Sequence, residues 1–142
     1  MTSFFPDVNV WIALVYSAHQ HHIPAVRWFD LLNGESAAFC RFTQLGLLRL
    51  LTQPGVMKED LKTQAEAWKI YDVLRQDERV LFLSETQSDD LDFIFRKLTS
   101  SLHSSANQWP DAYLSAFAAT ENLTLVTFDR SLHKTVPGSL LL

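Results

Sequence analysis

The sequence predicts an α/β fold in which a mainly parallel central sheet is covered by helices on both faces. Two observations support this. Short apolar runs alternate with longer segments of helical periodicity along the chain, and aspartates follow directly after two of these runs. In such sheets the ligand site lies at the carboxyl ends of the strands. The 142 residues contain no linker rich in Pro, Gly or Ser, so we expect a single domain over residues 1–142.

The N-terminal part predicts one strand followed by two helices. Ser3–Pro6 is a short apolar run that ends at Asp7, as expected of a buried strand. Val8–Tyr16 is apolar nearly throughout, which is typical of a core helix. After a polar break, apolar residues recur at helical spacing from Pro24 to Leu32, and the Asn-Gly pair that follows is a good helix stop.

The middle of the chain predicts a second strand and two further helices. Ala37–Cys40 is the second apolar run. We expect Thr43 to cap a helix that runs to Leu51, before a Pro-Gly pair. Glu59–Arg75 is amphipathic and predicts a long surface helix.

The next segment continues the alternation. Val80–Leu83 predicts a third strand, and Asp89–Leu98 predicts a helix whose first turn carries two acids that suit the helix dipole. Ser100–Gln108 is polar, predicts a loop, and is a candidate for substrate specificity. Pro110 is expected at the first position of a helix over Asp111–Thr120.

The C-terminal part predicts a fourth strand and a last edge strand. Leu123–Thr127 is apolar and delivers Asp129 just beyond its end, and Ser139–Leu142 fits an edge strand. Asp7 and Asp129 are therefore both expected at the carboxyl edge of the sheet, because parallel strands end together there. Asp111 lies in the first turn of a helix that can face the same crevice.

Asp7, Asp111 and Asp129 are the candidate functional residues. Each lies beside a strongly apolar segment, where a charge is costly unless it is paired or bound to a metal. Three converging carboxylates repel one another and raise their pKa values, and a hard divalent cation such as Mg²⁺ or Mn²⁺ resolves the repulsion.

Each acid alone also has a purely structural interpretation. Asp7 can cap the following helix, Asp111 can complement a helix dipole, and Asp129 can begin a turn. Residue types and spacing leave these two interpretations close to even. The short segments that surround the acids separate them.

Those segments are PDVNVWIALV (6–15), FCRFTQLGLLRLLT (39–52), WPDAYLSAFA (109–118) and LVTFDR (125–130). Together they resemble the PIN-domain ribonucleases, and more closely the VapC-type toxins of bacterial toxin–antitoxin pairs. The resemblance runs from Asp7 to Arg130 in the expected order. It implies a doubly covered parallel sheet and a Mg²⁺- or Mn²⁺-dependent endoribonuclease that leaves a 5′-phosphate and a 3′-hydroxyl.

The resemblance also assigns roles to individual residues. Asp7, Asp111 and Asp129 match the metal-binding aspartates of the family. Asn9 and Thr127 match polar residues that orient ligands or waters around the metal.

One position departs from the family pattern. PIN domains commonly carry a glutamate in the helix after the second strand, and here that position is occupied by Gln44. An amide can bond a metal-bound water, but it brings no negative charge and cannot act as a general base. Gln44 stays a candidate catalytic residue, while the departure weakens the case for a second metal ion.

Basic and imidazole side chains complete the set of candidates. Arg41 and Arg49 are candidate substrate contacts, because a guanidinium suits two phosphate oxygens, and Arg130 has the same standing. A surface or ion-paired arginine is the equal alternative. His19 and His22 resemble a metal pair, but no third ligand is in view, and we favour a structural role for them.

Composition excludes several classes of protein. With 12 basic and 16 acidic residues the formal net charge is −4, which argues against nucleic-acid binding by bulk basic charge. Cys40 is the only cysteine, so neither an intramolecular disulfide nor a cysteine zinc site can form. No signal peptide is visible, and Val10–Tyr16 is far short of the roughly 20 residues of a membrane helix. We therefore expect a cytoplasmic protein without a membrane partner.

The main hypothesis is a metal-dependent endoribonuclease with an RNA substrate, the toxin component of a type II toxin–antitoxin system. The resemblance further implies a cognate antitoxin and a homodimer. The alternative is a catalytically silent PIN-like module that binds RNA or a protein partner, with Gln44 as the sign of lost chemistry. A phospho-acceptor signalling domain fits poorly, because Ser84-Glu85 follows the third strand where a lone aspartate is needed.

Overall fold

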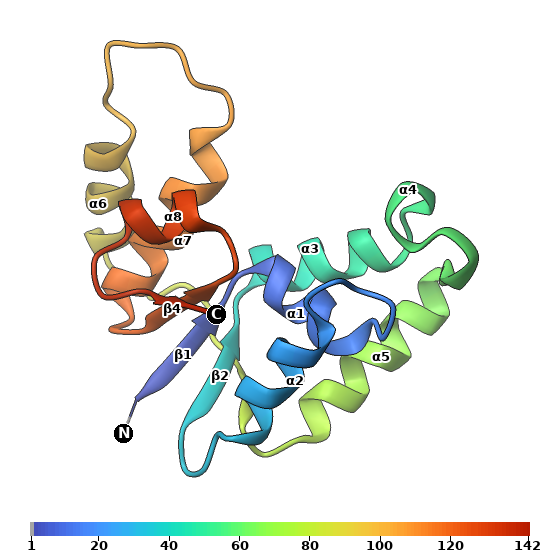
Figure 1. Cartoon of the computed structure of the whole chain (residues 1–142). Helices are drawn as coiled ribbons and strands as arrows, with labels where there is room; N and C mark the ends of the chain where they lie inside the picture. Colours follow the sequence, from blue (N-terminus) through green and yellow to red (C-terminus); the bar gives the residue numbers. More distant parts are fainter. Residues whose placement is uncertain (1) are drawn as a thin grey trace.

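The computed structural model describes residues 2–142, and a parallel sheet forms its centre (Figure 1). Within this range the sheet has five strands in the order β3-β2-β1-β4-β5, and every adjacent pair is parallel. The predicted α/β class with a mainly parallel sheet is confirmed. The strands are β1 (Ser3–Pro6), β2 (Ser36–Phe39), β3 (Val80–Phe82), β4 (Thr124–Thr127) and β5 (Leu140–Leu141).

Helices cover both faces of the sheet (Figure 1). One face carries α1 (Val8–Val15), α2 (His22–Asp30), α3 (Arg41–Leu51) and α5 (Gln64–Gln76), with the short α4 (Pro54–Met57) and the 3-10 turn η1 (Lys58–Asp60) between the last two. The other face carries α6 (Asp90–Leu98), α7 (Gln108–Thr120) and α8 (Arg130–Thr135). Over residues 2–142, no helix has both the length and the apolar character to cross a bilayer.

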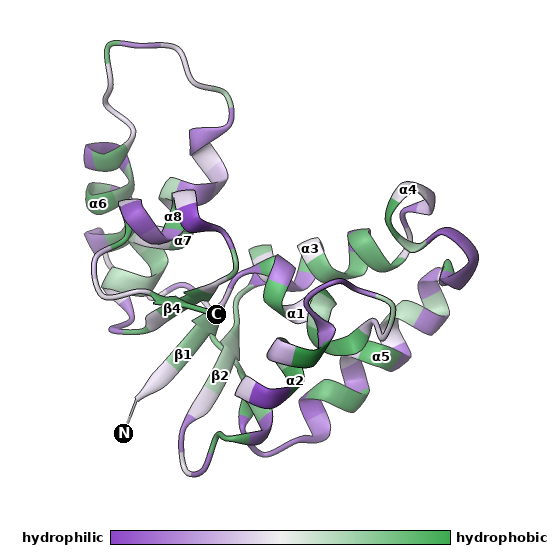
Figure 2. Cartoon of the chain, in the orientation of Figure 1, coloured by the Kyte–Doolittle hydropathy of each residue, from purple (hydrophilic) through white to green (hydrophobic). Residues whose placement is uncertain are grey.

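The core consists of two hydrophobic clusters, one on each face of the sheet. Successive residues of a strand point to opposite faces of the sheet, so each strand contributes to both clusters. Phe39 belongs to the cluster on the α1 face, where its ring stacks on Trp11 at 3.8 Å between ring centroids. Phe5 joins the other side and packs against Phe117 at 5.1 Å. Figure 2 shows helices that carry both hydrophobic and hydrophilic residues, whereas β4 is largely hydrophobic. This pattern is the one expected of a sheet buried on both faces.

The expected N-cap of α3 is wrong. The helix begins at Arg41 and its N-cap is Cys40, so β2 leads into α3 without a loop. Thr43 lies at the third helical position, where its hydroxyl accepts a hydrogen bond from the Cys40 N–H at 3.0 Å. The hydroxyl thus satisfies an N-terminal backbone group from inside the helix rather than from its cap.

The expected continuous helix over Glu59–Arg75 is wrong in its first turn. The chain reverses at Lys58, whose φ is +51°, and α5 starts only at Gln64. Thr63 caps α5: its hydroxyl accepts from the Glu66 N–H at 3.1 Å, and the Glu66 carboxylate accepts from the Thr63 N–H at 2.9 Å. This capping box fixes the start of the helix at Gln64, five residues after the start that the amphipathic pattern predicts.

Two differences concern the C-terminal half. Helix α7 starts at Gln108, which puts Pro110 at the third rather than the first helical position; the absence of an N–H is harmless anywhere in the first turn. A short helix, α8, follows Asp129, where the sequence suggested only a turn.

Candidate active site

Strands β1 and β4 lie side by side at the centre of the sheet, and their carboxyl ends define the candidate site. After β1 the chain adds β2 and β3 on one side of it, and then β4 and β5 on the other side. The direction in which strands are added therefore reverses between β1 and β4. Pro6 pairs with Val126, and the Asp7 N–H donates to the Val126 carbonyl at 2.9 Å. Ligand sites of open parallel sheets lie at such a switch point.

Asp7 is held by hydrogen bonds on both of its carboxylate oxygens. It caps α1, because Oδ1 accepts from the backbone N–H groups of Asn9 and Val10 at 2.9 and 3.2 Å. Oδ2 accepts from the Thr127 hydroxyl at 2.6 Å. The carboxyl is 5% exposed, and burial raises its pKa, although the hydrogen bonds oppose this rise; the charge of Asp129 raises it further.

Asp129 lies just beyond β4 and caps α8. Its Oδ1 accepts from the Ser131 N–H at 2.8 Å and from the Leu132 N–H at 3.3 Å. Its own N–H donates to the Thr127 hydroxyl at 2.9 Å. The fully buried Thr127 therefore connects the two aspartates through one oxygen atom.

Asp111 approaches the same region from the first turn of α7. It lines a pocket of about 250 Å³ together with Ser115 from its own helix and Ser131 from α8. Burial raises its pKa, and the charge of Asp129 raises it again. Because the charge of Asp129 raises the pKa of both other aspartates, Asp129 repels Asp7 on one side and Asp111 on the other.

These residues have the donor chemistry that a hard divalent cation requires. Three carboxylates are oxygen ligands of the kind that Mg²⁺ and Mn²⁺ select, and a cation would relieve the repulsion between Asp129 and the other two. Over residues 2–142, however, no three His, Cys, Asp or Glu side chains lie close enough to form a closed ligand set. Binding a metal in this arrangement would therefore draw the carboxylates together.

Gln44 is buried on α3, and its partner is Arg41. The Arg41 guanidinium donates to the Gln44 side-chain oxygen and lies 4.9 Å from the centre of the Phe82 ring. In the part of the chain that the structure describes, Gln44 makes no hydrogen bond to the three aspartates. Asn9 contributes its backbone N–H to Asp7 and leaves its side chain exposed.

The other two arginines occupy different places. Arg130 is exposed and directly follows Asp129 at the start of α8. Arg49 lies eight residues after Arg41 on the same helix, about 12 Å along its axis. There it lines a pocket of about 450 Å³ with Trp68 of α5, so the structure does not bring Arg49 to the aspartates.

The histidines have structural contacts. The His22 ring bonds the Ala13 carbonyl at 2.7 Å, and the His19 ring accepts from the His21 N–H at 3.0 Å. The His21 ring stacks on Phe128 at 4.4 Å. These contacts connect the start of α2 to α1 and to the end of β4, in agreement with the structural role expected of them.

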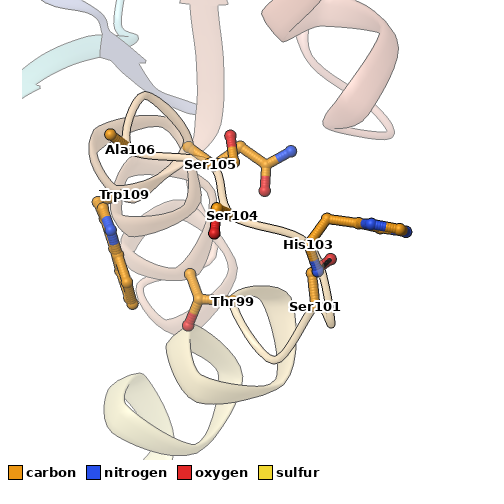
Figure 3. A pocket seen from close by; sticks show the side chains of 8 residues that line it. Thr99, Ser101, His103, Ser104, Ser105, Ala106 and Trp109 are labelled. Carbon is orange, nitrogen blue, oxygen red and sulfur yellow. Dashed lines mark hydrogen bonds between the residues drawn. The ribbon is translucent and has the colours of Figure 1, made fainter.

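The Ser100–Gln108 segment connects α6 to α7 and extends away from the sheet (Figure 1). Figure 3 shows Thr99, Ser104 and Trp109 around a pocket, with the His103 ring pointing away from Trp109. This pocket has a volume of about 340 Å³. Trp109 packs edge-on against Phe95 at 6.0 Å and remains 55% exposed. One part of the Trp109 ring thus packs on α6, and the other part faces solvent.

An all-parallel, doubly covered sheet with aspartates at its switch point defines a class of α/β proteins with an acidic site at the carboxyl edge. The PIN domain family model matches residues 4–136, and the chain therefore belongs to the PIN domain family.

Relatives and solved structures agree with this assignment. Ribonuclease VapC41 of Mycobacterium tuberculosis is 38% identical over 127 residues, which cover 87% of this chain and 86% of the relative. Ribonuclease VapC37 of the same species is 27% identical over 87% of this chain and 85% of its own length. The crystal structure of M. tuberculosis VapC20, a Sarcin-Ricin loop cleaving toxin, matches with a TM-score of 0.68 at 15% identity, covering 93% of this chain and 94% of VapC20. VapBC2 from Rickettsia felis, bound to a promoter DNA fragment, matches with a TM-score of 0.66 at 15% identity over 99% and 98% of the two chains.

Proposed function

We propose that this chain is the toxin of a type II toxin–antitoxin system and cleaves RNA as a Mg²⁺- or Mn²⁺-dependent endoribonuclease. The observation that carries the proposal is the 38% identity to a VapC ribonuclease over most of both chains. The acidic site at the switch point of the sheet supports it, because a divalent cation would relieve the repulsion between Asp129 and the other two carboxylates.

In the proposed mechanism Asp7, Asp111 and Asp129 hold the cation. When bound, such an ion lowers the pKa of a coordinated water and stabilises the charge that develops on the phosphate. The Thr127 hydroxyl positions both acids, because it donates to the Asp7 carboxylate and accepts from the Asp129 N–H. Arg41 is exposed at the same edge of the sheet and is the cationic side chain placed to bind a substrate phosphate.

The test is metal-dependent cleavage of a structured RNA by the purified protein. Wild type is expected to cut the RNA in Mn²⁺ or Mg²⁺ and to leave 5′-phosphate ends, whereas Asp7→Asn is expected to lose this activity. Asp72→Asn, on the exposed face of α5, is the matched control and should cut like wild type. Absence of cleavage by wild type, or equal cleavage by Asp7→Asn, would contradict the proposal.

Solved structures of similar fold support an antitoxin as the partner. The solved structures of similar fold include VapBC2 of Rickettsia felis and FitAcB of Neisseria gonorrhoeae, the latter with a TM-score of 0.58 at 16% identity over 98% of this chain and 96% of the other. We propose an antitoxin as the partner of this chain and a homodimer as its own assembly. Light scattering of the purified toxin should give twice the chain mass, and a monomer mass would exclude the dimer.

The alternative is a silent module that binds RNA or protein without cutting it. Gln44 favours this alternative, because its amide supplies neither charge nor a general base. RNA retention without cleavage, unchanged in Asp7→Asn, is the result that would support it.

A further inference from the structure

A further pocket, of about 500 Å³, opens at the carboxyl ends of β2 and β3. We call it the β3-edge pocket; its walls include Cys40, Arg41, Phe42, Phe82, Glu85 and Tyr113. Strands in a sheet lie about 4.8 Å apart, so the ends of β2 and β3 are about 5 and 10 Å from the end of β1. The pocket therefore lies at the same edge of the sheet as Asp7 and beside the proposed cleavage site.

Flat side chains form two sides of the pocket. The Arg41 guanidinium lies over the Phe82 ring at 4.9 Å, and Phe42 meets Tyr113 at 5.7 Å between ring centroids. Phe42 is 38% exposed, so part of its ring faces solvent. Aromatic rings and guanidinium planes are the surfaces on which proteins stack unpaired RNA bases.

A carboxylate lies at the rim of these flat surfaces. The Tyr113 hydroxyl donates to Glu85 Oε1 at 2.6 Å. Burial and this carboxylate raise the pKa of Tyr113, so the hydroxyl stays protonated and holds Glu85 in place. Over residues 2–142 this is the one hydrogen bond recorded for the Glu85 side chain, whose two oxygens can accept further donors.

Arg41 connects the pocket to α3. Its guanidinium bonds the neutral Gln44, and across the described residues it has no carboxylate partner. No ion pair therefore neutralises the positive charge of Arg41, which lies at the same edge of the sheet as the three aspartates. Arg41 can therefore attract a polyanion such as RNA, and its guanidinium forms a wall of the pocket.

We propose that the β3-edge pocket binds one unstacked base of the RNA next to the cleaved phosphodiester, and that it prefers guanine. This inference rests on the proposed function and deepens it. Guanine offers two adjacent N–H donors to the two oxygens of Glu85. Uracil has a single N–H between two carbonyl oxygens that a carboxylate repels, and adenine and cytosine place a ring nitrogen lone pair beside their amino donor. The Arg41 plane and the Glu85 carboxylate suit a base of this kind better than they suit an apolar side chain of a partner protein.

The test uses four fluorescein-labelled heptaribonucleotides, UUUNUUU, which differ only in the central base. Anisotropy titrations are done in EDTA, and a denaturing gel confirms that the RNA stays intact. Wild type is expected to bind the central-G heptamer about tenfold more tightly than the all-U heptamer, because a hydrogen-bonded carboxylate is lost on the wrong base. Glu85→Gln and Tyr113→Phe are expected to reduce this ratio to about twofold. Glu121→Gln, beyond the C-terminus of α7 at the opposite edge of the sheet, is the control and should keep the ratio.

The outcomes separate this inference from the proposed function. If wild type binds all four heptamers equally, or if Glu85→Gln keeps the preference for G, the base-binding pocket is wrong, whether or not the protein cuts RNA. If the preference depends on Glu85 but no RNA is cut, the pocket stands and the endoribonuclease fails.

Discussion

Asp7 carries two functions in one side chain, and they affect its pKa in opposite directions. As the cap of α1 it accepts two backbone hydrogen bonds, and these favour the charged form. As a buried group near Asp129 it is destabilised when charged, and burial has the larger effect. The sequence presented capping and metal binding as alternatives, and the geometry allows both at once.

The raised pKa of Asp7 gives a prediction for stability. A carboxyl whose folded pKa lies above its unfolded value of 3.8 binds more protons when folded. Its contribution to stability is therefore present below pH 3.8 and is lost as the pH rises through the folded pKa. In metal-free buffer at pH 7, Asp7→Asn should unfold at a higher temperature than wild type, and the difference should shrink as the pH falls toward 3.8.

The same pair of proteins tests the ligand role of Asp7. Added Mn²⁺ should raise the unfolding temperature of wild type, because a ligand that binds only the folded state stabilises it. Asp7→Asn should not respond. Thermal scans with and without Mn²⁺ measure both effects, with Asp72→Asn as the control. Equal responses of wild type and Asp7→Asn to Mn²⁺ would remove Asp7 from the metal site.

Gln44 gives the third prediction at this scale. Gln44→Glu would restore a negative charge on α3, and we expect it to tighten Mn²⁺ binding several-fold in a calorimetric titration. Arg41 would form an ion pair with the new carboxylate and so limit the gain. Gln64→Glu, exposed at the start of α5, is the matched control. An unchanged titration for Gln44→Glu would place this position outside the metal site.

At the scale of secondary structure, strands were easier to predict than helix ends. Apolar runs between polar segments located β1, β2, β3 and β4 to within one or two residues, because a strand buried on both faces admits few polar side chains. Helix starts depend on a few local hydrogen bonds, and competing sites for them look alike in sequence. Thr43 has a side chain suited to an N-cap, but the N-cap of α3 is Cys40. For α5, the capping box at Thr63 sets a later start than the one expected at Glu59.

The capping box of α5 gives a prediction of stability. Thr63→Ala removes the hydroxyl that accepts from the Glu66 N–H, and we expect it to lower the free energy of unfolding by about 1 kcal/mol. Urea titration would measure this loss, and the slope of the transition should not change. Ser17→Ala, at an exposed turn after α1, is the control and should have no effect. No loss in Thr63→Ala would mean that packing of α5 on α3 alone fixes the helix start.

At the scale of the whole molecule, topology explains what the sequence could and could not predict about the site. The alternating pattern predicted that Asp7 and Asp129 lie at one edge, and the pairing of β1 with β4 places them there. The pattern contained no measure of how far Asp111 stands from them, since that depends on how α7 packs on the sheet. The β3-edge pocket was invisible for the same reason, because its walls come from three separate segments.

The net charge of −4 gives the last prediction, on how RNA binding depends on salt. On a single strand each neutralised phosphate contributes about −0.7 to the slope of log affinity against log salt. The cations at the proposed edge are Arg41 and Arg130, so we expect a slope of about −1.4 for a UUUGUUU heptamer. Arg41→Ala should flatten the slope by about 0.7, whereas Arg27→Ala, exposed on α2, should leave it unchanged. A slope steeper than about −3.5 would require five or more contacts and a broad basic surface. Such a slope would contradict RNA binding through phosphate contacts at one edge of the sheet only.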